Sequence, residues 1–251
     1  NLIDATPIGV NVRSTVATYS GVLDELRRAF ARTEEAQAAG LKPGAFSYNT
    51  GSLRCPTCDG TGQITLDVQF LPDVDIECTE CRGSRYGAQA ASIRRDGLSL
   101  PDILAMSVDE ARVAVRGLKK AGTLLETLSG LGLGYLTLGE ATPALSGGEA
   151  QRLKLASEMG RRQDGALFVF DEPTIGLHPD DVQVLVDVLQ RLIERGATVV
   201  VIEHDLDLIR CADWVIDMGP GGGIEGGRIV AQGTPSEIVA NEASVTGRYL
   251  R

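Results

Sequence analysis

Two short apolar runs, residues 166–170 and 198–202, place the strongest constraint on the fold of this chain. Residues 180–195 between them carry apolar side chains at helical spacing, and the order strand, helix, strand is that of a parallel unit. A continuous apolar run such as 198–202 is typical of a parallel strand buried on both faces. The sequence therefore predicts an α/β fold. The same pattern continues with a short helix and two further strands at 206–211, 213–217 and 228–232.

Polar residues follow both apolar runs. Asp171 and Glu172 come after the first, and His204 ends the second. Because α/β proteins bind ligands at the carboxyl ends of parallel strands, these side chains are candidates for a catalytic site. Asp171 suits a Mg²⁺ shell through water, and Glu172 can polarise an attacking water. By themselves, the two acids can equally cap a helix, His204 can be a structural histidine, and His178 is expected in a loop.

A glycine-rich turn opens the helix predicted from Glu149 to Gly160. In Ser146-Gly147-Gly148 the backbone N–H groups are uncovered and lie at the positive end of the helix, which favours an anion. Taken alone, such a turn is equally an ordinary helix cap.

Four of the five cysteines form two Cys-x-x-Cys pairs separated by nineteen residues, namely Cys55 with Cys58 and Cys78 with Cys81. Two residues between thiolates let both sulfurs reach one ion from a tight turn. Two such turns complete a shell of four sulfurs that suits a closed, structural Zn²⁺ site. Glycines after each pair permit the turn with φ > 0 that points N–H groups at sulfur. Disulfides and a redox pair are the alternatives, although nothing suggests export and no βαβ unit surrounds the pairs.

The zinc-binding segment is predicted to be a small insertion at about residues 45–90, held by the ion rather than by a core. Apolar and polar residues alternate over 63–70, which predicts a half-exposed strand. Cys211 stands apart in an apolar, helix-like stretch and is expected to be a buried small residue.

The remaining residues before the glycine-rich turn favour helices. Apolar side chains over residues 20–40 predict a helix that Gly40 and Pro43 stop. Ser107, with Glu110 three residues later, predicts a capping box, and residues 118–128 predict a further helix.

The net charge of −10 is uneven, because residues 1–95 carry 10 Lys or Arg against 11 Asp or Glu. An acidic chain disfavours non-specific DNA binding by the whole surface, yet a basic patch is possible in this near-neutral part. The alternative, of equal weight, is that the arginines of residues 1–95 are scattered over the surface and solvated. These arginines are Arg13, Arg27, Arg28, Arg32, Arg54, Arg82, Arg85, Arg94 and Arg95. No apolar run is long enough to predict a membrane span, and the first residues lack the pattern of a signal peptide.

The order of these motifs resembles the ABC ATPase superfamily. Ser146-Gly-Gly-Glu149 is followed by a strand with Asp171-Glu-Pro173 and then by a strand that ends in His204. The resemblance implies one ATP site with Asp171, Glu172 and His204, whereas the Ser-Gly-Gly turn faces ATP held by another nucleotide-binding domain. No Gly-x-x-x-x-Gly-Lys-Ser/Thr phosphate loop occurs in the 251 residues. We therefore expect a segment of a longer protein that does not hydrolyse ATP alone.

More specifically, the chain resembles the UvrA family, the damage-recognition ATPases of bacterial nucleotide excision repair, over nearly its whole length. The matching motifs are Asp4-x-x-Pro7-Ile8-Gly9, Arg13-Ser14, Ala17-Thr18-Tyr19, Phe46-Ser47, Phe70-Leu-Pro-Asp-Val74, Gly132-Leu-Gly-Tyr135-Leu136, Leu145-Ser-Gly-Gly-Glu-Ala-Gln-Arg152, Asp171-Glu-Pro-Thr-x-Gly-Leu-His178, Val201-Ile-Glu-His204 and Ala212-Asp-Trp-Val-Ile-Asp217. The resemblance implies the C-terminal nucleotide-binding half of such a protein. It implies an ABC-type ATPase core with a parallel-rich sheet, a helical signature subdomain and the zinc insertion.

The same resemblance implies cofactors, partners and boundaries. The cofactors are structural Zn²⁺, ATP and Mg²⁺. The partners are damaged double-stranded DNA, helicase and nuclease subunits, and a second copy of the protein. The implied location is cytoplasmic. DNA contacts fall on Arg13, with Ser14 and Tyr19 as lesser candidates. The expected parts are a core segment at 1–20, an insertion and signature region at 21–130, and an ATPase core at 131–251.

Some positions depart from the family pattern. Ala5 stands where the family usually has a Gln that links the Mg²⁺ site to the helical region, and Thr15-Val16 replaces Asn-Pro. An insertion-like run spans residues 33–41. These departures favour an alternative function, a divergent relative tied to antibiotic tolerance. A second alternative is a non-catalytic zinc module, because the Cys-x-x-Cys-x-Gly-x-Gly run at 55–62 resembles the zinc repeats of DnaJ-type chaperones.

Overall fold

The computed structural model describes residues 2–9, 11–66, 74–159, 164–177, 179–219, 221 and 226–251, and for residues 179–181 the backbone alone. The chain divides into two compact units, residues 5–162 and residues 1–4 with 163–251. The predicted α/β class is confirmed, because a parallel sheet occurs together with many helices.

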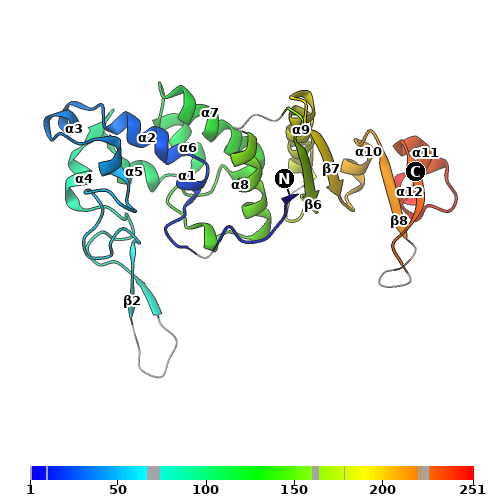
Figure 1. The fold of residues 1–251 in the computed structure, drawn as a ribbon, viewed down its shortest axis with the longest axis horizontal. Helices are drawn as coiled ribbons and strands as arrows, with labels where there is room; N and C mark the ends of the chain where they lie inside the picture. The colour runs from blue at the N-terminus through cyan, green and yellow to red at the C-terminus, as the bar shows by residue number, and fades with distance from the viewer. Residues whose placement is uncertain are drawn as a thin grey trace. The chain divides into compact units, whose positions relative to one another are not determined.

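The unit of residues 5–162 is built mainly from helices (Figure 1). Its helices are α1 (Val16–Tyr19), α2 (Val22–Phe30), α3 (Glu34–Ala38), η1 (Pro43–Phe46), α4 (Ala88–Ser92), α5 (Leu100–Leu104), α6 (Val108–Ala114), α7 (Lys119–Leu128), η2 (Ser129–Leu133), η3 (Thr142–Ala144) and α8 (Gly147–Met159). Its strands form two small antiparallel pairs, β2 (Gln63–Leu66) with β3 (Val74–Glu77) and β4 (Arg94–Arg95) with β5 (Leu98–Ser99).

Aromatic side chains form part of the core of this unit. Phe30 packs against Phe46 with ring centroids 6.1 Å apart, and Tyr48 meets Tyr86 edge-on at 5.9 Å. All four are buried, and full burial of a side chain of this size contributes roughly 1.5–3 kcal/mol. Each buried hydroxyl has a partner, since Tyr48 Oη lies 2.9 Å from Thr15 Oγ1 and Tyr86 donates to the Phe46 carbonyl at 2.7 Å. These contacts join α1 to the residues that flank the cysteine pairs.

The single helix predicted over residues 20–40 is wrong, because α2 ends at Phe30 and α3 begins at Glu34. The side chain of Thr33 accepts a hydrogen bond from the Ala36 N–H and starts a new helix there. The capping box of Ser107 and Glu110 is confirmed at the start of α6, and the helix predicted at 118–128 is confirmed as α7.

Strands β2 and β3 form a hairpin that projects away from the helices of its unit (Figure 1). The predicted strand is confirmed over Gln63–Leu66. Residues 67–73, with the Phe70 to Asp73 part of the family motif, lie outside the described residues, as does His178.

The second unit contains the parallel sheet, in the order β1 (Leu2–Ile3), β6 (Leu167–Asp171), β7 (Thr198–Ile202). Helix α9 (Pro179–Glu194) connects β6 to β7 and lies beside them in Figure 1. The remaining elements are α10 (Leu206–Arg210), β8 (Val215–Gly219), β9 (Arg228–Gly233), α11 (Pro235–Ala240) and α12 (Val245–Leu250), with β8 and β9 antiparallel. The strands and helices predicted from residue 166 onward are thus confirmed within two residues at their ends.

Burial in this sheet differs from the prediction. Phe168 and Phe170 of β6 are buried, but the side chains of β7 alternate between half-buried and exposed, and Ile202 is 51% exposed. The prediction that this strand is buried on both faces is therefore wrong for the described part of the chain, where α9 packs against β7. Cys211, expected to be buried, is exposed, because it follows the last turn of the five-residue helix α10, in which only Leu208 is buried. None of the described helices has the length and apolar character needed to cross a membrane.

Candidate functional site

The four paired cysteines converge in the structure. Their sulfur atoms all lie within 4.8 Å of one another, with Cys55 and Cys78 3.9 Å apart and Cys58 and Cys81 3.6 Å apart. Four thiolates around one Zn²⁺ at Zn–S distances of ~2.3 Å would be separated by roughly 3.8 Å. All four are free thiols, so the disulfide alternative is not supported. The cluster has the donor set and the spacing of a closed, structural zinc site.

Backbone turns of both Cys-x-x-Cys pairs direct polar groups toward the sulfurs. Gly60, Gly62 and Gly83 have φ of +80°, +78° and +73°, as the sequence predicted for this position of the turn. The Gly62 N–H lies 3.3 Å from the sulfur of Cys58. A Cβ at Gly60 would lie 1.8 Å from the carbonyl oxygen of Tyr48, so this turn is also in close contact with the aromatic core.

The thiols of the cluster do not ionise alike. Burial opposes ionisation of Cys58, but hydrogen bonds from the N–H groups of Gly62 and Gly60 and from the thiols of Cys81 and Cys55 outweigh it and lower its pKa to about 7. Burial and the neighbouring Cys58 raise the pKa of Cys81 to about 12. A bound metal ion would supply the positive charge that favours the thiolate form.

Arg13, the first of the predicted DNA contacts, is held by the first cysteine turn. Its Nη1 donates to the carbonyl oxygen of Asp59 at 2.7 Å, and its Nη2 lies 3.1 Å from Asp59 Oδ2. Arg54 pairs with the other carboxylate oxygen at 2.7 Å. Asp59 follows Cys58 directly and has φ of +50°, so the turn that presents sulfur also positions Arg13. Asp59 was not predicted from the sequence, although it carries a charge and lies beside a candidate metal ligand.

The three DNA-contact candidates gather at one hollow. Arg13, Ser14 and Tyr19 line a pocket of about 290 Å³ together with Asn11, Thr18 and Asn49. The residues that line it are polar, and one of them, Arg13, carries a guanidinium. Asp59 accepts hydrogen bonds from two of the five N–H donors of this guanidinium.

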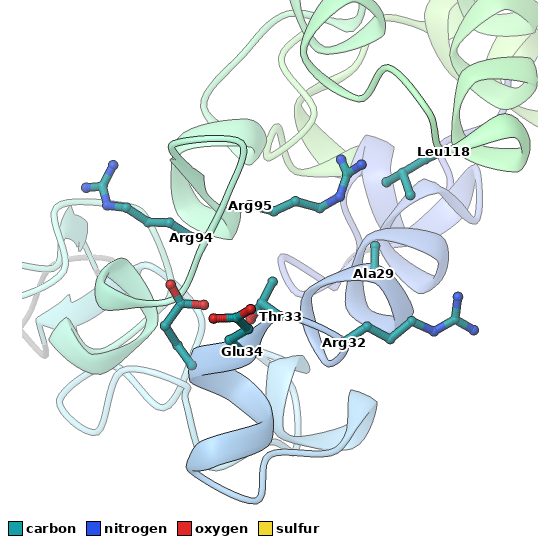
Figure 2. Close-up of a pocket in the computed structure, with 8 residues that line it drawn as sticks. Ala29, Arg32, Thr33, Glu34, Arg94, Arg95 and Leu118 are labelled. Carbon is teal, nitrogen blue, oxygen red and sulfur yellow. The ribbon is translucent and has the colours of Figure 1, made fainter.

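Most other arginines of the near-neutral part have acidic or backbone partners. Arg27 and Arg28 pair with acids one turn earlier on α2, and Arg85 is buried, donating to the Val12 carbonyl at 2.9 Å with its guanidinium 5.2 Å from the ring centre of Tyr48. A second hollow of about 450 Å³ has both signs of charge, as Figure 2 shows. Its charged lining residues are Arg32, Glu34, Glu35, Arg94 and Arg95. The described residues therefore offer scattered cations rather than one continuous basic patch.

The Ser146-Gly147-Gly148 turn is a reciprocal cap in the structure. The Ser146 N–H donates to Glu149 Oε2 at 2.6 Å, and the Glu149 N–H donates to Ser146 Oγ at 3.3 Å. Tyr135 donates to the other carboxylate oxygen at 2.5 Å. Ser146 and Gly147 are exposed at the first turn of the 13-residue helix α8. The turn is thus fixed in place, with Ser146 and Gly147 exposed to solvent.

Glu172 and His204, the two predicted catalytic residues, are in contact. Asp171 ends β6, and Glu172 has φ of +46° and donates its N–H to the carbonyl of Ile202 at 2.9 Å. The carboxylate oxygen Oε1 of Glu172 lies 2.9 Å from His204 Nε2. A charged carboxylate only accepts, so this contact is a hydrogen bond when the imidazole carries a proton on Nε2. Both side chains are accessible, His204 at 81% and Glu172 at 40%, so the pair can face a substrate.

Glu203 lies between Ile202 and His204, within a motif, and was not predicted to be a site residue. Its carboxylate accepts hydrogen bonds from Thr174, His204 and Asp205. The signal that would have revealed it is an acid at the end of a strand, next to the candidate histidine.

Comparisons with known proteins show what this chain is similar to. No family model matches the chain. Residues of this chain are 50% identical over 250 positions to "UvrABC system protein A" of Aquifex aeolicus (strain VF5) and of Bacillus subtilis (strain 168), each match covering 99% of the chain. The solved structure of UvrA2 from Deinococcus radiodurans matches all of the chain with a TM-score of 0.91 and 44% identity.

This chain is homologous to a segment of UvrA. It spans about a quarter of the length of those curated relatives, 27% and 26%, and 31% of the UvrA2 chain. The fold class predicted from the UvrA resemblance is therefore confirmed over the whole segment.

Replacing Cys55 with Ser should remove zinc from this chain, because three thiolates no longer complete the tetrahedral shell. Metal analysis of the purified protein should fall from one Zn²⁺ per chain toward zero, and amide exchange over residues 45–90 should accelerate. The matched control is Cys211→Ser, which changes an exposed thiol outside the cluster. Full zinc content in the Cys55→Ser protein would exclude the four-sulfur site.

Proposed function

We propose that this chain is part of an ATP-dependent DNA-damage sensor of nucleotide excision repair. The observation that carries the proposal is the contact of Glu172 with His204 at the carboxyl end of the parallel strands β6 and β7. An accessible carboxylate next to an imidazole suits the activation of water for attack on a phosphoanhydride. The likeness to UvrA supports this choice among ATP-dependent reactions.

Within this function each predicted residue has a role. Glu172 orients and deprotonates the attacking water, and His204 holds the Glu172 carboxylate in place. Asp171, at the end of β6, would hold Mg²⁺ through water, and Mg²⁺ would neutralise the charge that develops on the phosphates. Ser146, with the N–H groups of Gly147 and Gly148, would bind phosphates of an ATP held by another nucleotide-binding domain.

The DNA-binding part of the proposal rests on Arg13. Its guanidinium lines the polar pocket with Ser14 and Tyr19, and Asp59 holds it against the zinc-type cluster. A guanidinium presented in this way suits a backbone phosphate of damaged double-stranded DNA.

The partners we propose are helicase and nuclease subunits of the same repair system and a second copy of the protein, in the cytoplasm. We keep the functional division into 1–20, 21–130 and 131–251 as part of the proposal.

Ala5 favours a second candidate function, a divergent UvrA-like ATPase of antibiotic tolerance. Its methyl group cannot accept or donate a hydrogen bond, and its carbonyl lies 3.2 Å from where a Cβ of Gly147 would be. The two candidates differ in their DNA preference. Selective binding of lesion-bearing over intact duplex by the full-length protein supports repair, and equal binding supports tolerance.

The chain alone should show no appreciable ATP hydrolysis, because its sequence contains no phosphate loop to hold the β- and γ-phosphates. Phosphate release by the purified 251-residue chain should match a protein-free blank. Robust turnover by this chain would contradict the assignment of the site. The remaining tests therefore use an ATPase-competent, full-length protein that contains the chain.

In that protein, Glu172→Gln should slow turnover by roughly 10²–10⁴-fold, because the amide cannot take a proton from water. Nucleotide affinity should stay the same, since the change affects the chemical step alone. Steady-state phosphate release and equilibrium nucleotide binding separate the two effects. Glu194→Gln, an exposed glutamate at the end of α9, is the matched control. Unchanged hydrolysis in Glu172→Gln would remove Glu172 from the role of base.

Arg13→Ala should weaken DNA binding by roughly 1 kcal/mol, about fivefold, through the loss of one charged contact. The slope of log affinity against log salt should fall by about 1, and intact and damaged duplex should be affected alike. Fluorescence anisotropy at several salt concentrations measures both quantities. Arg28→Ala on α2, where Arg28 pairs with Glu25, is the control. An unchanged salt slope would show that Arg13 does not contact phosphate.

A further inference from the structure

The side chain of Glu203 connects the two loops that carry the candidate catalytic pair. Its Oε1 accepts hydrogen bonds from the N–H of Thr174, at 2.8 Å, and from the Thr174 hydroxyl. Its Oε2 accepts from the N–H of His204 at 2.6 Å and from the N–H of Asp205 at 3.1 Å. One carboxylate therefore holds the loop after β6 against the loop after β7.

These contacts leave Glu203 no capacity for proton transfer to a substrate. A carboxylate has about four lone-pair positions, and four donors are directed at the oxygens of Glu203. Burial opposes its ionisation, but the hydrogen bonds from Thr174, Asp205 and His204 prevail and keep its pKa below the usual value for Glu. The group is a permanently charged acceptor at neutral pH.

The position of Glu172 depends on the same two loops. Its backbone has φ of +46°, a conformation that costs a non-glycine residue energy and persists only where neighbours enforce it. On one side, the Glu172 N–H is fixed to the Ile202 carbonyl at 2.9 Å. On the other side, Thr174 is fixed by Glu203. Between these two anchors, Glu172 Oε1 reaches His204 Nε2 at 2.9 Å.

The anchor extends into the next helix. Asp205, whose N–H is bound by Glu203, caps α10 by accepting from the N–H groups of Asp207 and Leu208 at 3.0 and 2.9 Å. His204 thus lies between a fixed strand end and a fixed helix start. Its backbone is held on both sides, and its exposed ring contacts Glu172.

We propose that Glu203 is a positioning residue for ATP hydrolysis, because its carboxylate holds Thr174, His204 and Asp205 so that Glu172 and His204 meet. This inference rests on the proposed ATPase function. The oxygens of Glu203 are occupied by Thr174, His204 and Asp205, so Glu203 acts through Glu172 and His204 rather than on the reacting atoms. A small displacement of a catalytic group is enough to slow a reaction by up to roughly 100-fold.

In the full-length protein, Glu203→Ala should lower kcat for ATP hydrolysis by roughly 10- to 100-fold and change KM by less than about threefold. Glu203→Gln should be almost as slow, because its NH₂ group must face either the Thr174 N–H or the N–H groups of His204 and Asp205. Recovery of kcat by Gln would assign Glu203 to packing and overturn the proposal. Thr174→Val, which removes only the hydroxyl donor, should give a smaller loss of kcat.

A double-mutant cycle separates positioning from general stability. In a Glu172→Gln background, adding Glu203→Ala should cause little further loss, because the group that it positions is already disabled. An equal loss in both backgrounds would show that Glu203 acts by another route. Glu194→Gln serves again as the exposed control. If Glu172→Gln has no effect, the proposed ATPase site fails; if only the Glu203 variants have none, the positioning role fails.

Amide exchange tests the contacts without reference to activity. In Glu203→Ala, exchange should accelerate in peptides that cover residues 172–175 and 203–206 and stay unchanged over residues 45–90. Unchanged exchange at both loops would overturn the proposal even if turnover falls. Acceleration over the whole protein would show a folding defect, in which case the Thr174→Val rates decide, and wild-type kcat in that variant would count against the positioning role.

Discussion

The hairpin of β2 and β3 depends on one constraint, the convergence of the four cysteine sulfurs at its base. The hairpin of β2 and β3 buries almost nothing, since Leu66, Val74 and Ile76 are exposed, and the cluster at its base consists of the cysteines with Ile64. Two strands without an apolar face are not stable on their own in water. A metal ion bound by the four sulfurs would supply the missing free energy and fix both turns at once. Because Asp59 follows Cys58 and pairs with Arg13, such an ion would also fix the position of this candidate DNA contact.

Carboxylates have the same structural task at each candidate site. Asp59 accepts from Arg13 and Arg54, Glu149 accepts from Ser146 and Tyr135, and Glu203 accepts from Thr174 and the amides after β7. Hydrogen bonds to a charged acceptor are stronger than those between neutral groups, although water weakens them at an exposed acid such as Asp59. Loops without an apolar core can therefore be held by acids. The net charge of −10 reflects, in part, acids that hold functional turns rather than an acidic surface alone.

Local patterns predicted much of this fold, and contacts between distant residues account for the errors. The capping box of Ser107 and the limits of β6 and β7 depend on neighbours in the sequence, and both were predicted. Whether the side chains of β7 and Cys211 are buried depends on which other elements pack over them. The apolar composition of a segment does not determine this packing. The break after Phe30 was not predicted, because the helical spacing of α2 was taken to continue past Thr33. Thr33 caps the start of α3 and ends that continuity. At the sites, spacing predicted the ligand cysteines and the residues Glu172 and His204. It did not predict Asp59 or Glu203, because Arg13 lies 46 residues from Asp59 and Thr174 lies 29 residues from Glu203 along the chain.

Ala5 stands where the resemblance implies a Gln, yet its segment is still connected to the residues around the glycine-rich turn. Thr6, the next residue, accepts a hydrogen bond from Lys154 of α8 at 2.9 Å, and the Ile8 carbonyl accepts one from Thr142 at 3.2 Å. Ala5 itself lies against Gly147, where a Cβ would be 3.1 Å from the Ala5 methyl group. A small residue at position 5 and a glycine at position 147 thus fit together, and the segment is tied to α8 through Thr6. Movement of this segment would therefore be transmitted to the start of α8 by direct contact and one hydrogen bond rather than by a glutamine side chain.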